Sequence, residues 1–209
     1  MGEFLGYMSF SLIEGLAVYA LILSIFRFPF AKFIWPIVLM VTATNLQSFF
    51  IRDELELTAI SPIINVIITI LFLVIFMRIP IVWSMVMTVT GYISFALLQT
   101  LIVLCSNGYL SLSQIQDYAW KGYQLQLITG LVGMAIGWLL YKFGYGFSYE
   151  FEKLRFKRER VLIIVFLVGF LIGLGIVMYF KAIFTNFLIF AVALFIFLSY
   201  SLRKDQSEW

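Results

Sequence analysis

Glu14 is the residue whose type and position most directly suggest chemistry. It lies about ten residues into an apolar run of about 4 to 26, and no other charged side chain stands inside that run. An ionisable group at that depth of a bilayer is costly and is by default a candidate functional residue. Its carboxyl would be protonated, hydrogen-bonded by polar side chains or turned toward a wet cavity. The alternative is a position near the outer interface, from which it reaches water.

Amide side chains recur in the other apolar runs at the depth that Glu14 borders, in the outer half of the membrane. A shared depth on several helices is what an outward-opening polar pocket requires. The candidate ligand-binding residues are Glu14, Asn45, Gln47, Asn65, Gln99 and Gln126. The alternative interpretation is that the amides form interhelical hydrogen bonds, which fasten a bundle without binding anything.

Catalytic chemistry has little support in the residue types. The chain contains no histidine and a single cysteine, Cys105, so the usual general base and multi-cysteine metal sites are missing. There is no phosphate-binding glycine-rich loop, no nucleophile elbow and no metal-ligand cluster. We therefore expect a non-enzymatic protein with no catalytic residue, metal or other cofactor, and with no nucleic-acid partner.

The elements that must position these residues are membrane-spanning helices. Of the 209 residues, 63% are hydrophobic and 12% are charged, against about 25% charged in a soluble domain. A span takes about 20 apolar residues. We predict an all-α polytopic bundle, a single domain over 1–209, with seven spans. They run over about 4–26, 33–51, 58–77, 81–105, 122–143, 161–180 and 184–202.

The distribution of basic residues orients this bundle. An external N-terminus leaves Arg52, Lys121 and Lys181 outside and places the other eleven of the fourteen lysines and arginines inside. That asymmetry satisfies the positive-inside rule and puts the C-terminus in the cytoplasm. Fusing the last two runs would give six spans, but a helix of that length is roughly twice the hydrocarbon thickness. We therefore expect two helices joined by a tight turn at Lys181.

Two longer links connect the predicted spans. The external link 106–120 mixes polar residues with tyrosine and tryptophan, which indicates a short helix lying in the membrane interface or a lid over an outer pocket. The cytoplasmic stretch 150–160 is strongly basic. Attraction to anionic lipid headgroups explains it, and docking of a cytoplasmic partner is the alternative. The candidate docking residues are Lys153, Arg155, Lys157 and Arg158.

Small-residue spacing occurs in two of the predicted spans. Glycines at 130, 133 and 137 share the fifth span, and glycines at 169 and 173 share the sixth. Such spacing lets helix backbones approach closely. It predicts packing within the chain, with a homodimer as the alternative.

Several features together resemble a known family. Short-looped spans, an outer N-terminus and a basic link before the last two spans are joined by an Arg78-Ile79-Pro80 turn and the run 87–92 that follows. The chain resembles the membrane sensor half of agr-type, peptide-sensing histidine kinases of Gram-positive bacteria. In that family the last span continues into a coiled helix and a kinase, whereas this sequence stops at residue 209. The resemblance thus implies a sensor-like module that signals through a partner.

The functional expectation combines the pocket and this resemblance. We expect a multi-pass protein of a bacterial, Gram-positive plasma membrane that binds a peptide or small amphipathic ligand in its outer half. It would contact membrane lipids and signal through a cytoplasmic or membrane protein partner. The alternatives are a substrate-binding subunit of an uptake transporter and a structural subunit of a larger membrane complex.

Overall fold

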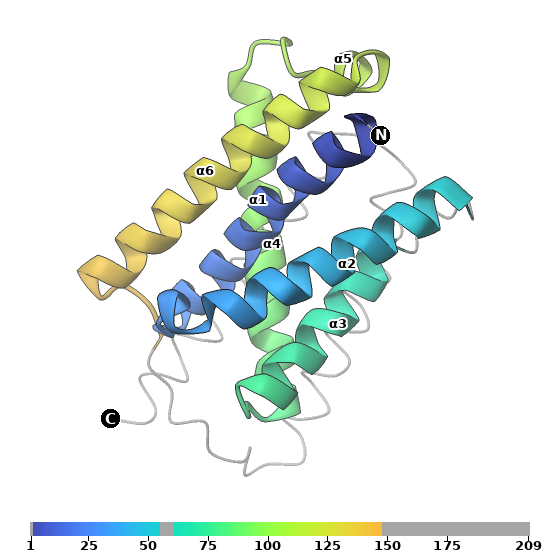
Figure 1. Cartoon of the computed structure of the whole chain (residues 1–209). Helices are drawn as coiled ribbons and strands as arrows, with labels where there is room; N and C mark the ends of the chain where they lie inside the picture. The colour runs from blue at the N-terminus through green and yellow to red at the C-terminus, as the bar shows by residue number, and fades with distance from the viewer. Residues whose placement is uncertain (1, 55–60, 148–209) are drawn as a thin grey trace. The chain divides into compact units, whose positions relative to one another are not determined.

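The computed structural model describes residues 2–54 and 61–147, and this part of the chain consists of helices joined by turns and short loops, without a strand (Figure 1). The predicted all-α fold is therefore confirmed. In chain order the elements are α1 (Gly2–Ile25), the 3-10 turn η1 (Phe30–Phe33), α2 (Ile34–Glu54), α3 (Ser61–Phe76), α4 (Ile81–Cys105), the short α5 (Leu112–Asp117) and α6 (Ala119–Phe143).

The first five predicted spans each coincide with a helix. The runs at 4–26, 33–51, 58–77, 81–105 and 122–143 correspond to α1, α2, α3, α4 and α6. Helix α6 begins three residues earlier than predicted, because the extended backbone of Tyr118 forms its N-cap. The runs 161–180 and 184–202, with the turn at Lys181, lie outside the described residues.

Three of the described helices are long and apolar enough to cross a membrane: Phe4–Ile25, Ile81–Cys105 and Ala119–Phe143. Helix α3 is apolar but shorter. A bilayer favours such segments because a helix satisfies its own backbone hydrogen bonds. The count of seven spans and the orientation of the termini stay predictions.

The chain divides into two compact units, which are described separately. The first contains Met1–Leu46 and Gly91–Phe147, and the second contains Gln47–Thr90 and Ser148–Trp209. Within the first unit, α1 is the central helix. All eight residues over 17–24 are buried, although a helix that faced the core on one side would bury only a stripe. Helix α1 is therefore surrounded over two turns.

Helix α6 packs along α1 through its three spaced glycines. A Cβ built on Gly130 would lie 2.6 Å from Ile13 Cγ2, and one on Gly133 would lie 3.1 Å from Ala17 Cβ. A Cβ on Gly137 would lie 3.2 Å from the backbone of Ala20. Residue numbers rise together on both helices, so α1 and α6 run parallel. The spacing at 130, 133 and 137 thus serves packing within the chain, as predicted, and a homodimer would have to use another face of α6. The glycines at 169 and 173 lie outside the described residues.

Helices α2 and α4 contact α1 at two further glycines. Gly15 on α1 faces Val41 of α2, where a Cβ would come within 2.4 Å of Val41 Cγ1. Gly91 on α4 faces Ile22, where a Cβ would come within 2.1 Å of Ile22 Cγ1. Gly133 lies near both Leu98 of α4 and Ala17 of α1. Rising residue numbers on α4 therefore meet falling numbers on α1, so the two helices are antiparallel. Because these glycines have no side chains, α2, α4 and α6 can all approach α1 closely.

The C-terminal ends of α1 and α6 are joined by the segment that follows α6. Gly144, at φ 68°, ends α6 in the left-handed conformation that favours glycine. Three residues later, Phe147 N–H donates a hydrogen bond of 2.8 Å to the carbonyl of Ile25. The Phe147 ring packs on the Phe26 ring at 5.8 Å. This segment thus supplies a partner for a helix-end carbonyl that α1 cannot satisfy itself.

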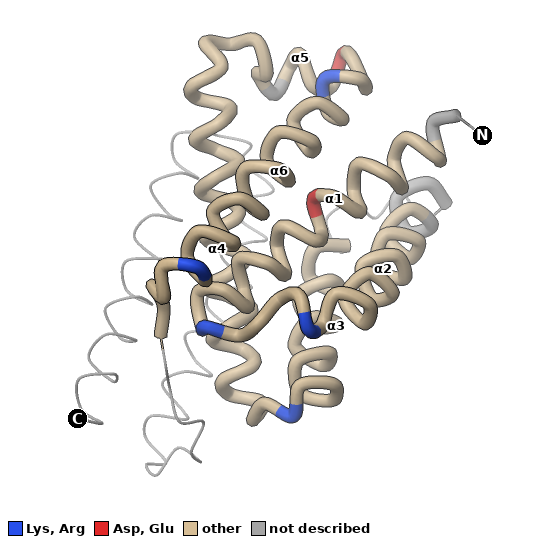
Figure 2. The backbone as a smooth tube through the Cα atoms, turned by 60° about the vertical axis from the view of Figure 1, so that its left-hand side comes forward, with Lys and Arg blue, Asp and Glu red and all other residues tan. Residues whose placement is uncertain are grey.

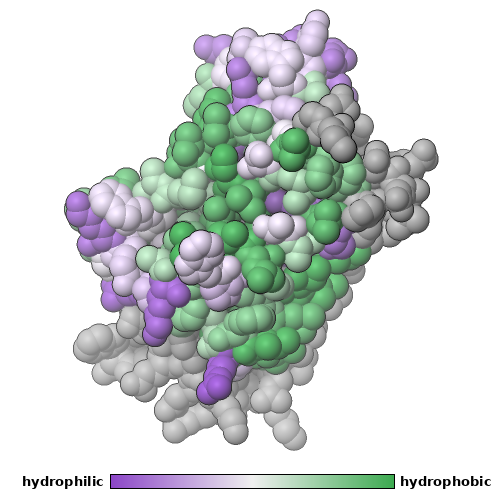
Figure 3. Space-filling view, viewed as in Figure 1, coloured by the Kyte–Doolittle hydropathy of each residue, from purple (hydrophilic) through white to green (hydrophobic). Residues whose placement is uncertain are grey.

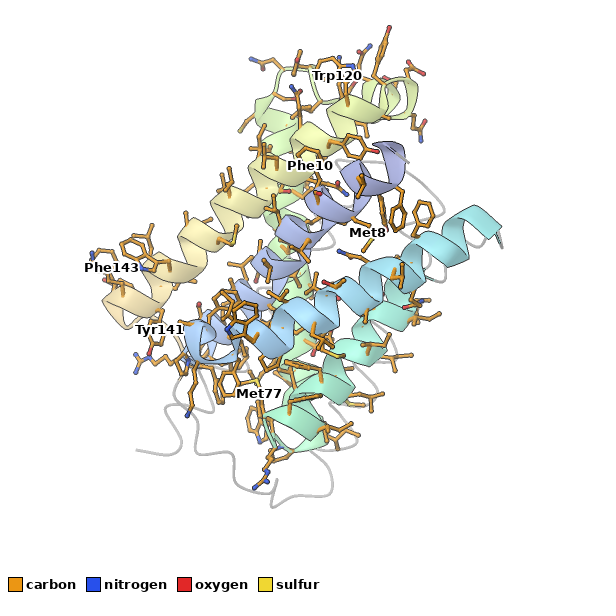
Figure 4. All side chains as sticks on the ribbon, in the orientation of Figure 1. Met8, Phe10, Met77, Trp120, Tyr141 and Phe143 are labelled. Carbon is orange, nitrogen blue, oxygen red and sulfur yellow. The ribbon has the colours of Figure 1, made fainter. Side chains whose placement is uncertain are left out.

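Aromatic and charged residues mark both ends of α6. Trp120 lies at the α5 end and Tyr141 and Phe143 at the opposite end (Figure 4), and 21 residues at 1.5 Å make Trp120 and Tyr141 about 32 Å apart along the axis. This matches the roughly 30 Å of a hydrocarbon core. Figure 3 shows hydrophobic residues along α6 between more polar ends. Aromatic residues in these two places are typical of a spanning helix.

Candidate binding site in a polar layer

Glu14 lies in the middle of α1. It is the eleventh of the 22 residues of the candidate span Phe4–Ile25, about 15 Å from Phe4 at 1.5 Å per residue. The side chain is half-buried, and the neighbouring residues Ile13 and Gly15 are packed against α6 and α2. This position favours the mid-membrane interpretation of Glu14 over a place at the outer interface.

Gln126 of α6 lies one turn from Glu14 along the shared axis. Its Nε2 donates a hydrogen bond of 3.4 Å to Ser11 Oγ on α1. Its Oε1 is buried and has no hydrogen-bond partner among the described residues. The amide therefore fastens α6 to α1 with one atom and leaves the other available.

Asn45 and Gln99 approach the same level from α2 and α4. Asn45 lies one turn beyond Val41, which faces Gly15, and α2 runs antiparallel to α1, so Asn45 is level with Ser11. Leu98 and Ala17 both lie near Gly133. Gln99 follows Leu98 directly, so Gln99 is nearly level with Ala17. The amide Nδ2 of Asn45 is buried and has no partner in the described part of the chain.

Four predicted site residues thus form one layer, called here the polar layer and defined as Glu14, Asn45, Gln99 and Gln126. Measured on α1, the layer extends from the level of Ser11 to about that of Ala17, six residues or about 9 Å. It is centred on Glu14, in the middle of α1. A carboxyl group and three amides are thus gathered near the middle of α1.

The other two predicted site residues belong to the second unit. Asn65 Nδ2 of α3 donates a hydrogen bond of 3.1 Å to Ser48 Oγ of α2. This contact fits the alternative interpretation, in which amides within the spans form interhelical hydrogen bonds. Both amide atoms of Gln47 are buried without a partner among the described residues. A single pocket that includes all six residues stays a prediction.

The link 106–120 contains the short helix that its composition indicated. Helix α5 occupies Leu112–Asp117, and the link is tied to α6 through Lys121, whose ammonium group donates a hydrogen bond to Gln114 Oε1. Sequence reasoning treated Lys121 only as an external charge. The sequence feature that could have identified a role for Lys121 is the pair of aromatic residues beside it, Tyr118 and Trp120.

Ser11 is the second residue that the sequence analysis missed. Serine is common in apolar helices, where it bonds to its own backbone, so nothing local distinguished it. Its position three residues before Glu14 places the two on neighbouring turns. That spacing was the available signal, and only the partner on α6 shows what Ser11 does.

Three of the four described basic residues of the first unit lie at one end. Arg27, Lys32 and Lys142 lie at or just beyond the C-terminal ends of α1 and α6, while Asp117 and Lys121 lie at the α5 end (Figure 2). This separation agrees with the charge asymmetry on which the orientation was predicted. The candidate docking residues Lys153, Arg155, Lys157 and Arg158 lie outside the described residues.

Known proteins offer no further guide to the polar layer. Comparison with protein-family models, with curated proteins and with solved structures produced no match. The resemblance to peptide-sensing kinases therefore stays an expectation from the sequence.

Proposed function

We propose that this chain is a non-enzymatic, sensor-like integral membrane protein that binds a peptide or small amphipathic ligand through the polar layer. The observation that carries the proposal is Glu14 at mid-helix, with the amides of Asn45, Gln99 and Gln126 at its level. Ionisable residues at such depth are retained mainly for ligands, ions or protons. The buried amide atoms of Asn45 and Gln126 without partners among the described residues support it further.

Signalling would then pass through a partner protein on the cytoplasmic side. The basic ends of α1 and α6 face that side in the predicted orientation, and the basic stretch 150–160 follows directly in sequence. We propose the plasma membrane of a Gram-positive bacterium as the location, on the resemblance alone. A shift of α1 against α6 on ligand binding is the simplest route between the two ends.

The test is ligand retention in Glu14→Ala. The chain is purified from its native membrane in mild detergent, and co-purifying small molecules and proteins are identified by mass spectrometry. We expect Glu14→Ala to retain at least tenfold less of the co-purifying ligand while keeping the fold. A matched control is Thr42→Val, because Thr42 is level with Glu14 but exposed and bonded only to its own helix.

Two outcomes would contradict the proposal. Equal amounts of ligand in Glu14→Ala and the unaltered chain would remove the polar layer from recognition. Co-purification with a transport ATPase in place of a kinase or response protein would favour the alternative of an uptake-transporter subunit.

A further inference from the structure

Lys121 is held in a cage of aromatic rings at the N-terminal end of α6. Its Nζ lies 4.6 Å from the ring centroid of Tyr109, 5.5 Å from that of Tyr118 and 5.7 Å from that of Trp120. The rings of Tyr109 and Trp120 meet edge to face, with centroids 6.5 Å apart. Gln114 Oε1 accepts a hydrogen bond from the same ammonium group. We call Tyr109, Tyr118 and Trp120 the aromatic cage.

The cage surrounds a cation in a position that is otherwise unfavourable. Lys121 is only 8% exposed, so its ammonium group has lost most of its water. It also lies in the first turn of α6, where the helix dipole repels positive charge. No carboxylate of the described residues pairs with it. Three ring faces and one amide oxygen therefore provide the attraction that holds this ammonium group.

The rings themselves are reachable from outside the cage. Tyr109, Tyr118 and Trp120 are each about half exposed, although the ammonium group between them is buried. Tyr109 precedes α5, and Tyr118 and Trp120 follow it. The cage thus brings both ends of the link between α4 and α6 together at the N-terminal end of α6.

We propose that the aromatic cage is a recognition site for an ammonium group presented from outside, and that Lys121 is its internal occupant. Aromatic faces and a carbonyl oxygen are the chemistry that recognises primary and quaternary ammonium groups. An entering ammonium group takes the place of Lys121 and releases the link. The proposal uses no residue of the polar layer, so it stands or fails independently of the proposed function.

The first experiment removes the internal occupant. Lys121→Ala is purified in detergent, labelled with 5-fluorotryptophan and titrated with tetramethylammonium chloride, with sodium chloride as the ionic-strength control. The Trp120 fluorine signal is assigned with Trp120→Phe. We expect a saturable shift of that signal, with an affinity at least tenfold tighter than in the unaltered chain. Adding Tyr109→Ala removes the nearest ring and should weaken binding about tenfold.

The matched control is a lysine that contacts a single ring. Lys142 Nζ lies 4.6 Å from the Trp138 ring centroid at the other end of α6. Since one exposed ring holds a cation only weakly, Lys142→Ala should show no saturable shift of the Trp138 signal. An equal response at Trp138 and Trp120 would overturn the proposal, because it would show a general effect of the salt on exposed rings.

A second measurement uses the unaltered chain and does not depend on the variant's fold. Lys121 is acetylated with a membrane-impermeant amine reagent, and its rate is followed by mass spectrometry with and without tetramethylammonium. We expect the caged amine to react slowly and its acetylation to accelerate at least threefold with tetramethylammonium, while Lys142 keeps its rate. An unchanged rate at Lys121 together with no binding by Lys121→Ala overturns the proposal.

Discussion

Gly91 and Gly122 both lie inside helices, but a side chain at each would meet different surroundings. A Cβ at Gly91 would lie 2.1 Å from Ile22 Cγ1 and 3.1 Å from the Cα of the same residue. At Gly122 the nearest atom would be Ile115 Cγ2 at 3.7 Å, which is ordinary van der Waals contact. Glycine is therefore required at Gly91 by a close helix approach and is merely tolerated at Gly122.

This contrast leads to a prediction about stability. Gly91→Ala should destabilise the fold by about 1–3 kcal/mol, because the α4 backbone or Ile22 must move. Gly122→Ala should be neutral or stabilise by up to about 1 kcal/mol, because alanine is the better helix former. Thermal unfolding in the same detergent measures both. Equal destabilisation by the two variants would show that α4 does not approach α1 as described.

At the scale of elements, the contact of α1 with α6 determines which residues meet. Gly130, Gly133 and Gly137 meet Ile13, Ala17 and Ala20 in rising order, so the helices are parallel although more than 90 residues separate them in sequence. If every span crosses the membrane once, two parallel spans must be separated by an odd number of intervening spans. This agrees with the prediction that α1 and α6 are the first and fifth spans.

Disulfide cross-linking tests this register. In a Cys105→Ser background, Ala17→Cys with Gly133→Cys should cross-link readily on mild oxidation, because the Cβ separation of 3.1 Å is close to the roughly 3.5–4.5 Å of disulfides. Ala17→Cys with Gln126→Cys should not, because seven residues displace the second site by about 10 Å. Mobility on non-reducing gels distinguishes the pairs, and preferential linking of the second pair would refute the register.

At the scale of the whole molecule, charge and aromatic placement indicate how the chain sits in a bilayer. The first unit separates Arg27, Lys32 and Lys142 at one end from Asp117 and Lys121 at the other. The positive-inside rule predicts that the end with three basic residues faces the cytoplasm. The α5 end, with the aromatic cage, then faces outward.

Cysteine accessibility measures this orientation. In the Cys105→Ser background, Ser113→Cys in α5 should react with a membrane-impermeant maleimide in intact cells. Ala31→Cys in η1 should react only after permeabilisation, because it lies beyond the other end of α1. Both positions are exposed, so burial cannot explain a difference. Reversed labelling would invert the predicted topology, and labelling of both from outside would mean that α1 does not cross.

The success of sequence reasoning differed between elements and site. Helices α1 and α4 were predicted to within two residues at each end, because a long apolar run bounded by charges or proline has no other stable form in a bilayer. The layer of Glu14, Asn45, Gln99 and Gln126 followed from depth counting, which needs only helix rise. The partner of Gln126 did not follow, because depth does not specify how each helix is rotated about its axis.

The sequence by itself determined that this chain is helical, which runs are apolar enough to span and which end of each carries charge. These properties depend on residues adjacent in the chain and on the cost of an unsatisfied backbone in lipid. Only the tertiary structure decided that Ser11 meets Gln126, 115 residues away, and that three rings enclose Lys121. Such contacts depend on the rotation and register of packed helices, which are determined by close packing at positions such as Gly130.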